Sequence, residues 1–237
     1  VRAQVANTPE SFPAIARDVV WGQVDVIHDR PGKNDKLFHL GGGGQTTQAL
    51  AKLAEGAQER IVIQSPYVVL SDKAIALFKR LIARGVKVRI STNSLASTDN
   101  IQAFSGYRNQ RNKLLKMGLE IYEYRPDPAV RTKLMPRTAA NDKPPIFAIH
   151  AKSMVVDGKQ AFIGTYNLDP RSENLNTEVG VVIHDASVAR KVEQAIETDM
   201  QPGNSWNAAE DKPDQYGSLA KRSRIRLWQQ VPIKPLL

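Results

Sequence analysis

The order of strand and helix patterns between residues 60 and 124 constrains the fold more than any other feature of the sequence. Arg60–Val69, Val86–Ser91 and Leu119–Tyr124 are apolar runs of the kind that form buried strands. The two segments between them have helical spacing, one after the N-cap candidate Ser71 and the other over Ile101–Met117. Strands that alternate with helices need right-handed crossovers, which produce a parallel sheet covered by helices.

The second half of the chain adds further strands to this pattern. Phe147–Val156, Gln160–Gly164 and Thr177–Ile183 are strand-like, and a helix is expected from about Ala186 to Met200. We therefore predict an α/β fold with a mixed, largely parallel β-sheet sandwiched by helices.

Glycine and proline clusters suggest the domain boundaries. We expect residues 1–40 to be the tail of a preceding repeat or a linker, residues 41–205 to form the catalytic domain, and residues 206–237 to be a C-terminal tail that packs on the domain or on a membrane. Gly41–Gly44 is predicted to be a joint. Arg125–Pro145 contains five prolines, and so long a break inside a domain is usually functional or mobile.

Composition narrows the chemistry without choosing it. The chain has no cysteine, which excludes disulfides, thiolate nucleophiles and cysteine metal sites. Its net charge of +9 suggests a polyanionic partner, which could be nucleic acid, an anionic lipid surface or a phosphate substrate. No apolar run approaches the roughly 20 residues that span a bilayer.

The segments that carry chemistry are His150-Ala-Lys152, followed by Asp157, and then Gly164-Thr165-Tyr-Asn167. If residues 147–156 form a strand, His150 and Lys152 point to the same side, because side chains alternate along a strand. The next strand would deliver Thr165 and Asn167 to the same end of the sheet. We therefore expect an imidazole, an ammonium, a hydroxyl and a carboxamide to converge there.

This set of groups suits a phosphodiester substrate. Lys152 and Asn167 can supply the positive charge and hydrogen-bond donors that phosphate oxygens need as negative charge develops. His150 can attack phosphorus or transfer a proton. A lone histidine on a strand is more often a packed or solvent-facing residue, but the whole spaced pattern arises rarely by chance.

The pattern resembles the HKD motif of the phospholipase D superfamily, with Thr165 where that family has serine. The resemblance implies that Glu178 orients His150 by accepting a hydrogen bond from it. It also implies that Asp157 holds the local backbone rather than taking part in catalysis, and that Gly164 is a structural residue of the motif.

The resemblance also implies that the site is only half present, because enzymes of this superfamily use two such motifs. Of the four histidines, only His150 has a lysine two residues later. Either two copies of the chain associate, or the other half lies upstream. The segments Gln64–Tyr67, Thr92–Asp99 and Asn167–Glu178 resemble the second repeat of two-motif bacterial cardiolipin synthases, which favours the upstream half.

Such enzymes imply a specific reaction: phosphatidyl transfer between phosphatidylglycerol and a second phospholipid, or phospholipase D-type hydrolysis, through a phosphohistidine. His150 would be the general acid and base. No metal or organic cofactor is implied. The resemblance further implies peripheral association with an anionic membrane surface, the bacterial inner membrane. Tyr67 and Asn93, at the ends of their strands, are expected to line the substrate pocket together with Thr165.

Two other functions stay open. The chain could be a homodimeric nuclease of the same superfamily, since its charge permits nucleic acid binding. It could also be a non-catalytic half domain that binds anionic surfaces. Its 15 aromatic residues are not interleaved with basic stretches, which weakens the case for stacking on single strands.

Overall fold

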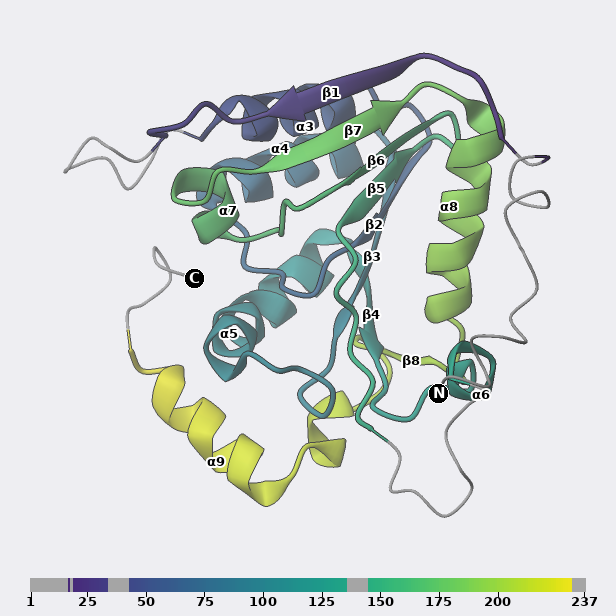
Figure 1. Cartoon of the computed structure of the whole chain (residues 1–237). Coiled ribbons are helices and arrows are strands. Elements are labelled where there is room, and N and C mark those ends of the chain that lie inside the picture. Colours follow the sequence, from purple (N-terminus) through teal and green to yellow (C-terminus); the bar gives the residue numbers. More distant parts are fainter. Residues whose placement is uncertain (1–16, 18, 34–42, 136–144, 232–237) are drawn as a thin grey trace.

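The protein is organised around one eight-stranded sheet. The computed structural model describes residues 17, 19–33, 43–135 and 145–231. The strand order is β1-β7-β6-β5-β2-β3-β4-β8 (Figure 1). The strands are β1 Val24–His28, β2 Arg60–Gln64, β3 Lys87–Asn93, β4 Glu120–Tyr124, β5 Ser153–Val156, β6 Gln160–Gly164, β7 Val179–Ile183 and β8 Ser205–Asn207.

The predicted α/β class is confirmed, but the sheet is mostly antiparallel rather than largely parallel. Only the pairs β2–β3 and β3–β4 are parallel, because only these strands are joined by crossover helices. The motif strands β5 and β6 form an antiparallel hairpin next to β2. The parallel arrangement predicted from strand–helix alternation is therefore confirmed for residues 60 to 124. It does not extend to the strands outside this range, which pair antiparallel.

The sheet is covered unequally on its two faces. Helices α3 (Gln45–Glu55), α4 (Asp72–Ala83) and α5 (Ile101–Met117) lie on one face, and α8 (Ala186–Asp199) lies on the other (Figure 1). The larger core lies under α3, α4 and α5 and includes Ile61, Ile90 and Ile121. A smaller core lies under α8, where Ala189, Ile196 and Met200 contact Val62, Val155 and Ala161.

The predicted helices follow local signals closely. Ser71 caps α4 by accepting a hydrogen bond from the Ala74 backbone N–H, and α5 ends at Gly118, which has φ of 103°. In contrast, the strand predicted for residues 147–156 begins only at Ser153, so residues 145–152 are extended but unpaired in the sheet. Within the described residues of the proline-rich stretch 125–145, the chain forms the short α6 (Arg131–Leu134).

The predicted domain boundaries also need correction. β1 lies before residue 40, yet it pairs with β7 and belongs to the sheet. At the other end, β8 spans residue 206, and the 3-10 helix η1 (Pro213–Tyr216) and α9 (Leu219–Trp228) follow it. Helix α9 packs on α5, so this part of the tail belongs to the domain. Residues 1–16, 18, 34–42, 136–144 and 232–237 lie outside the described residues, and these include Gly41 and Gly42 of the predicted joint.

Candidate active site

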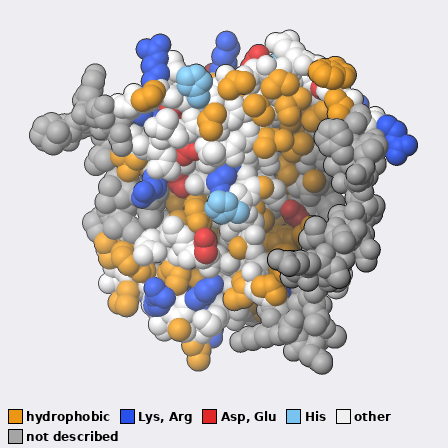
Figure 2. Space-filling model, viewed as in Figure 1, with side chains coloured by type: hydrophobic (Ala, Val, Ile, Leu, Met, Phe, Trp, Pro, Cys, Tyr) orange, Lys and Arg blue, Asp and Glu red, His pale blue; other side chains and the backbone are white. Residues whose placement is uncertain are grey.

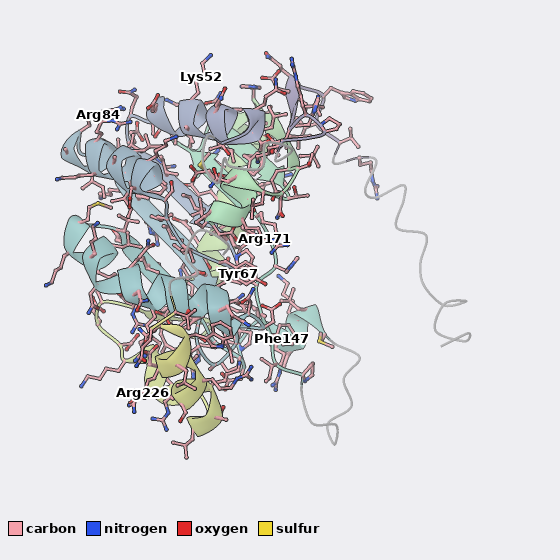
Figure 3. All side chains as sticks on the ribbon, turned by 90° about the vertical axis from the view of Figure 1, so that its left-hand side faces the viewer. Lys52, Tyr67, Arg84, Phe147, Arg171 and Arg226 are labelled. Atoms are coloured by element: carbon pink, nitrogen blue, oxygen red, sulfur yellow. The ribbon has the colours of Figure 1, made fainter. Side chains whose placement is uncertain are left out.

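The predicted site residues gather at one end of the sheet, which we call the catalytic end. β2 and β6 finish there, whereas β5 and β7 start there. Figure 3 shows Tyr67, Arg171 of α7 (Pro170–Asn174) and Phe147 near one another in the middle of the view. The chain therefore brings the ends of several strands together around His150.

His150 and Lys152 lie close together on the extended segment before β5. The Lys152 ammonium is 3.2 Å from His150 Nδ1 and donates a hydrogen bond of 2.8 Å to the His150 carbonyl. Partial burial lowers the pKa of Lys152, and the nearby carboxylates of Glu178, Asp169 and Asp99 oppose this shift. The imidazole itself is exposed, as expected of a group that must reach a substrate.

Asn93 holds this segment in place. Its side-chain oxygen accepts a 2.8 Å hydrogen bond from the Ile149 N–H, and its amide donates a 2.9 Å bond to the Ile149 carbonyl. At Ile149, the Asn93 side chain therefore makes the hydrogen bonds that a neighbouring strand would otherwise make. Asn93 is buried and its amide is engaged with the backbone, so in this structure it positions the residue before His150.

Glu178 is buried at the catalytic end, but its contact differs from the expected one. Its carboxylate accepts a short hydrogen bond from the Thr165 hydroxyl, which also accepts a bond from the Val179 N–H. Among the described residues, the His150 ring has Lys152 as its side-chain partner. The predicted bridge from Glu178 to His150 is therefore not formed in this structure, and Thr165 shields the carboxylate.

Asn167 and Gly164 occupy the loop that follows β6. The side-chain oxygen of Asn167 is buried and has no hydrogen-bond partner, which leaves it available to a donor. At Gly164 a Cβ would lie 2.5 Å from the Val179 carbonyl, so only glycine allows β6 and β7 to approach this closely. The predicted structural role of Gly164 has a clear physical basis.

Asp157 lies at the opposite end of β5, far along the strand from Lys152. Its carboxylate accepts backbone hydrogen bonds of 2.9 Å each from Gln58, Glu59 and Arg60. It adopts a positive φ of 52° at the hairpin turn before Gly158. The motif aspartate thus fixes the start of β2, in agreement with a structural role.

The sequence patterns did not predict a buried ion pair that lies at the catalytic end. Asp29 and Lys33 are joined at 2.7 Å, and Asp29 accepts bonds from the N–H groups of Thr46 and Glu178. Lys33 also donates to the carbonyls of Ser172 and Asn176. The pair ties β1 to the loops beside Asn167 and Glu178. The alternating strand pattern Val24–His28 was the available signal.

Tyr67 lies at the mouth of the site and contacts Asp99. Its hydroxyl donates a 3.0 Å hydrogen bond to this carboxylate. Partial burial, and then the nearby charge of Asp99, raise the pKa of Tyr67 to about 12. Tyr67 therefore stays protonated at neutral pH and can act as a hydrogen-bond donor beside the catalytic end.

Comparison with known proteins identifies the family. Residues 50–200 match the sequence profile described as "Cardiolipin synthase, PLD-like domain". The chain belongs to this phospholipase D-like family. Cardiolipin synthase C of Escherichia coli is 35% identical over 240 residues, which cover 92% of this chain and 49% of that protein. The chain thus spans about half the length of this cardiolipin synthase.

Solved structures show the same phospholipase D-like fold. Phosphatidylserine synthase of Haemophilus influenzae has a TM-score of 0.60 and 17% identity, with 90% of this chain and 48% of that chain covered. Nuc of Salmonella typhimurium, a phospholipase D family member, has a TM-score of 0.53 and 16% identity, with 78% and 98% covered. The fold of this cardiolipin synthase-like chain therefore occurs both as about half of a chain and as a nearly whole one. None of the described helices is long and apolar enough to cross a membrane.

Proposed function

We propose that this chain is the second half-site of a phosphatidyltransferase that makes cardiolipin from phosphatidylglycerol and a second phospholipid. The observation that carries the proposal is the joint arrangement of His150, Lys152 and Asn167 at one end of the sheet in a chain of the cardiolipin synthase family. Hydrolysis of the same phosphodiester bond is the corresponding side reaction when water replaces the lipid alcohol.

Each residue of the site has a separate role in this reaction. A histidine of the other half attacks phosphorus and forms a phosphohistidine, while His150 protonates the departing alcohol. His150 then removes the proton of the incoming alcohol, whose oxygen attacks phosphorus and releases the first histidine. Lys152 neutralises the phosphate oxygens, and Asn167 holds a hydroxyl or phosphate through its side chain. Glu178 reaches His150 once Thr165 turns toward the substrate.

An uncovered part of the sheet supports the need for a second half. On the face that carries α8, the strands β1, β7 and β6 expose apolar side chains, and Figure 2 shows hydrophobic atoms gathered in the upper part of the view, where β1 and β7 lie. The most exposed are Val26 at 67%, Val24 at 50%, Val179 at 47% and Ile163 at 43%. Such a patch is typical of an interface. We propose that the other half of the polypeptide, or a second copy, covers it.

The test uses the full-length enzyme on phosphatidylglycerol vesicles. His150→Ala should reduce cardiolipin formation to below a tenth of wild type without changing the circular dichroism spectrum. His184→Ala is the matched control, because His184 contacts Asp25 at 2.7 Å near the opposite end of β7 and should keep its activity. Activity of His150→Ala above a tenth of wild type contradicts the assigned role.

Light scattering and a second substrate distinguish the alternatives. A chain of residues 1–237 that is inert alone and regains lipid activity with the upstream half supports the proposal. A stable dimer that cleaves DNA favours the nuclease. Val26→Glu should weaken association with the second half, whereas Leu219→Glu, on the exposed side of α9, should not.

A further inference from the structure

We propose that a cavity between α3 and α4 binds one aliphatic chain of a lipid whose head carries a hydroxyl group. The cavity has a volume of about 480 Å³. Ligand sites in proteins commonly measure roughly 300–1,000 Å³. The choice of a lipid rests on the proposed function, whereas the site itself rests on the shape, polarity and charge of this cavity.

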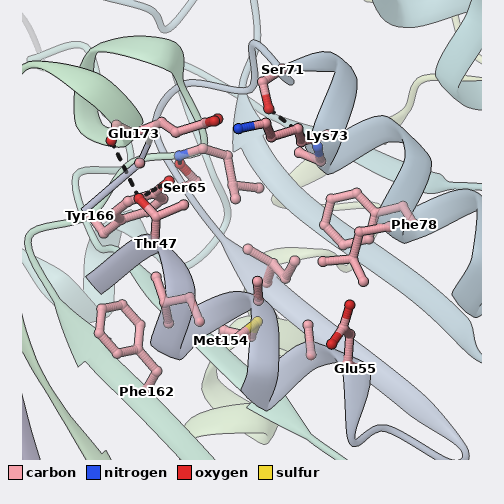
Figure 4. A pocket seen from close by; sticks show the side chains of 18 of the residues that line it. Thr47, Glu55, Ser65, Ser71, Lys73, Phe78, Met154, Phe162, Tyr166 and Glu173 are labelled. Atoms are coloured by element: carbon pink, nitrogen blue, oxygen red, sulfur yellow. Dashed lines mark hydrogen bonds between the residues drawn. The ribbon is translucent and has the colours of Figure 1, made fainter. Parts of the chain in front are cut away.

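The walls of the cavity are apolar. Ile63 of β2, Met154 of β5 and Phe162 of β6 line it from the sheet, and Leu50 of α3 and Leu77 of α4 line it from the helices. Figure 4 shows Met154 and Phe162 among the side chains around the cavity. The cavity follows α3, whose 11 residues extend over about 16 Å at 1.5 Å per residue. An apolar space that follows a helix suits a hydrocarbon chain better than a polar ligand.

The cavity extends from an exposed ion pair to the catalytic end. Glu55 of α3 and Arg80 of α4 line it at the far end and form this ion pair, at 3.0 Å. Both helices begin at the catalytic end, where Thr47, Lys73 and Glu173 line the opening. A lipid whose hydrocarbon chain enters through this opening leaves its head group beside the loop that carries Asn167.

The opening contains a largely buried carboxylate. Glu173 is only 8% exposed and lines the opening together with Lys73. Figure 4 shows Glu173 and Lys73 pointing toward each other across the opening. A carboxylate with this little contact with solvent gains from a hydrogen-bond donor, which the head of a bound ligand can supply.

The charges at this opening indicate what kind of head group fits. Glu173 and Lys73 have opposite charges, so together they favour an uncharged head. A hydroxyl can donate to the Glu173 carboxylate and accept from the Lys73 ammonium. Thr47 donates to the Tyr166 hydroxyl at 3.2 Å and adds a second polar contact at the same end. A carboxylate head would instead meet the charge of Glu173.

The cavity adjoins the catalytic loop without including its reactive groups. Tyr166 and Leu168 line the cavity, whereas their neighbours Thr165 and Asn167 belong to the active site. The Ser65 hydroxyl accepts a 3.1 Å hydrogen bond from the Leu168 N–H and fixes the loop between the two spaces. A hydrocarbon chain bound in the cavity would therefore hold its lipid next to the site of reaction.

Calorimetry with 1-monodecanoylglycerol below its micelle-forming concentration tests the proposal on the full-length enzyme. One molecule per cavity should bind with a negative change in heat capacity, which marks apolar burial. Ala51→Trp, which fills the cavity from α3, should weaken binding at least about tenfold. Ala83→Trp, on the exposed end of α4 outside the cavity, is the matched control.

The head group is tested separately. Decanoate has a chain of the same length and should bind at least about tenfold more weakly than the glycerol ester. Glu173→Gln should narrow this difference, because it removes the charge while keeping a polar side chain. Equal affinity of the wild type for both ligands would overturn the assignment of the hydroxyl head to Glu173.

Two further results would overturn the site itself. Either Ala51→Trp leaves binding unchanged, or the wild-type enzyme binds no ester. His150→Ala should bind the ester like wild type. Loss of turnover is thus separated from loss of binding, and failure of the proposed chemistry leaves this test intact.

Discussion

The two ends of the sheet are each held by an aspartate that accepts backbone hydrogen bonds, but only one of them supports the active site. Asp157, the aspartate of the motif, binds the N–H groups of Gln58 to Arg60 at the end away from Lys152. Asp29, which belongs to no motif, binds Glu178 at the catalytic end. Membership of the motif therefore does not indicate which aspartate the chemistry depends on.

The difference between them lies in burial and in their partners. Asp29 is 2% exposed and paired with Lys33, so both charges depend on each other. Asp157 is half-buried and is held by the backbone alone. Removing the Asp29 carboxylate leaves the buried Lys33 charge unpaired at the site. Removing the Asp157 carboxylate loosens a hairpin turn that solvent can reach.

The largest effect is expected for Asp29→Asn. Lys33 would lose its charge partner while buried, and breaking a buried pair costs about 3–5 kcal/mol. The free energy of unfolding from urea titration should fall by this amount, and turnover should fall at least about tenfold as the Glu178 loop shifts. The double variant Asp29→Asn/Lys33→Met should recover part of the stability. If Asp29→Asn had the same free energy of unfolding as wild type, the Asp29–Lys33 ion pair would not stabilise the catalytic end.

Asn93→Ala should have the next largest effect. It leaves the buried N–H of Ile149 without a partner, which costs about 1–3 kcal/mol. We expect kcat to fall at least about tenfold with little change in KM, because His150 is displaced while the lipid still binds. Asn109→Ala, on the exposed surface of α5, is the control. A rise in KM alone would indicate a pocket residue instead.

Asp157→Asn should lower stability while sparing activity. Its carboxylate accepts three hydrogen bonds from backbone N–H groups. Their partial loss in a half-exposed turn should lower the free energy of unfolding by about 1.5 kcal/mol. Turnover per folded molecule should stay within about twofold of wild type, a change below about 0.5 kcal/mol. A loss of activity as large as that of Asp29→Asn would erase the distinction between the two ends.

The smallest effect concerns acid stability. Burial opposes ionisation of Asp29, but hydrogen bonds from Lys33, Thr46 and Glu178 outweigh it and lower its pKa. A carboxyl with a lowered folded-state pKa stabilises the protein above its unfolded pKa of about 3.9, and this contribution disappears as pH falls through the folded value. The stability difference between wild type and Asp29→Asn should therefore shrink below about pH 4. A constant difference down to pH 2 contradicts this linkage.

Local signals allowed much of the fold to be predicted. Helix α5 begins and ends at the predicted residues because a capping asparagine and Gly118 define it within its own sequence. Strand–helix alternation likewise identified β2, β3 and β4. These features depend on neighbours in the chain, which a sequence displays directly.

The remaining features depend on contacts between distant segments. The strand ahead of Ser153 was predicted too long because residues 147–152 have strand-like composition, yet their partner is the side chain of Asn93. Similarly, β1 was assigned to a linker because its partner, β7, comes very much later in the chain. Convergence of His150, Lys152 and Thr165 at one end was expected from the motif; the support provided by Asp29 was not.

The pairing of β1 with β7 has a consequence for synthesis of the chain. The strand Val24–His28 leaves the ribosome long before Val179–Ile183, so it waits without a partner while the central strands fold. Pairings between such distant segments form late, and an exposed apolar strand is prone to aggregate in the meantime. A translational pause or a chaperone that acts after residue 28 would thus affect the yield of active protein more than one that acts after residue 183.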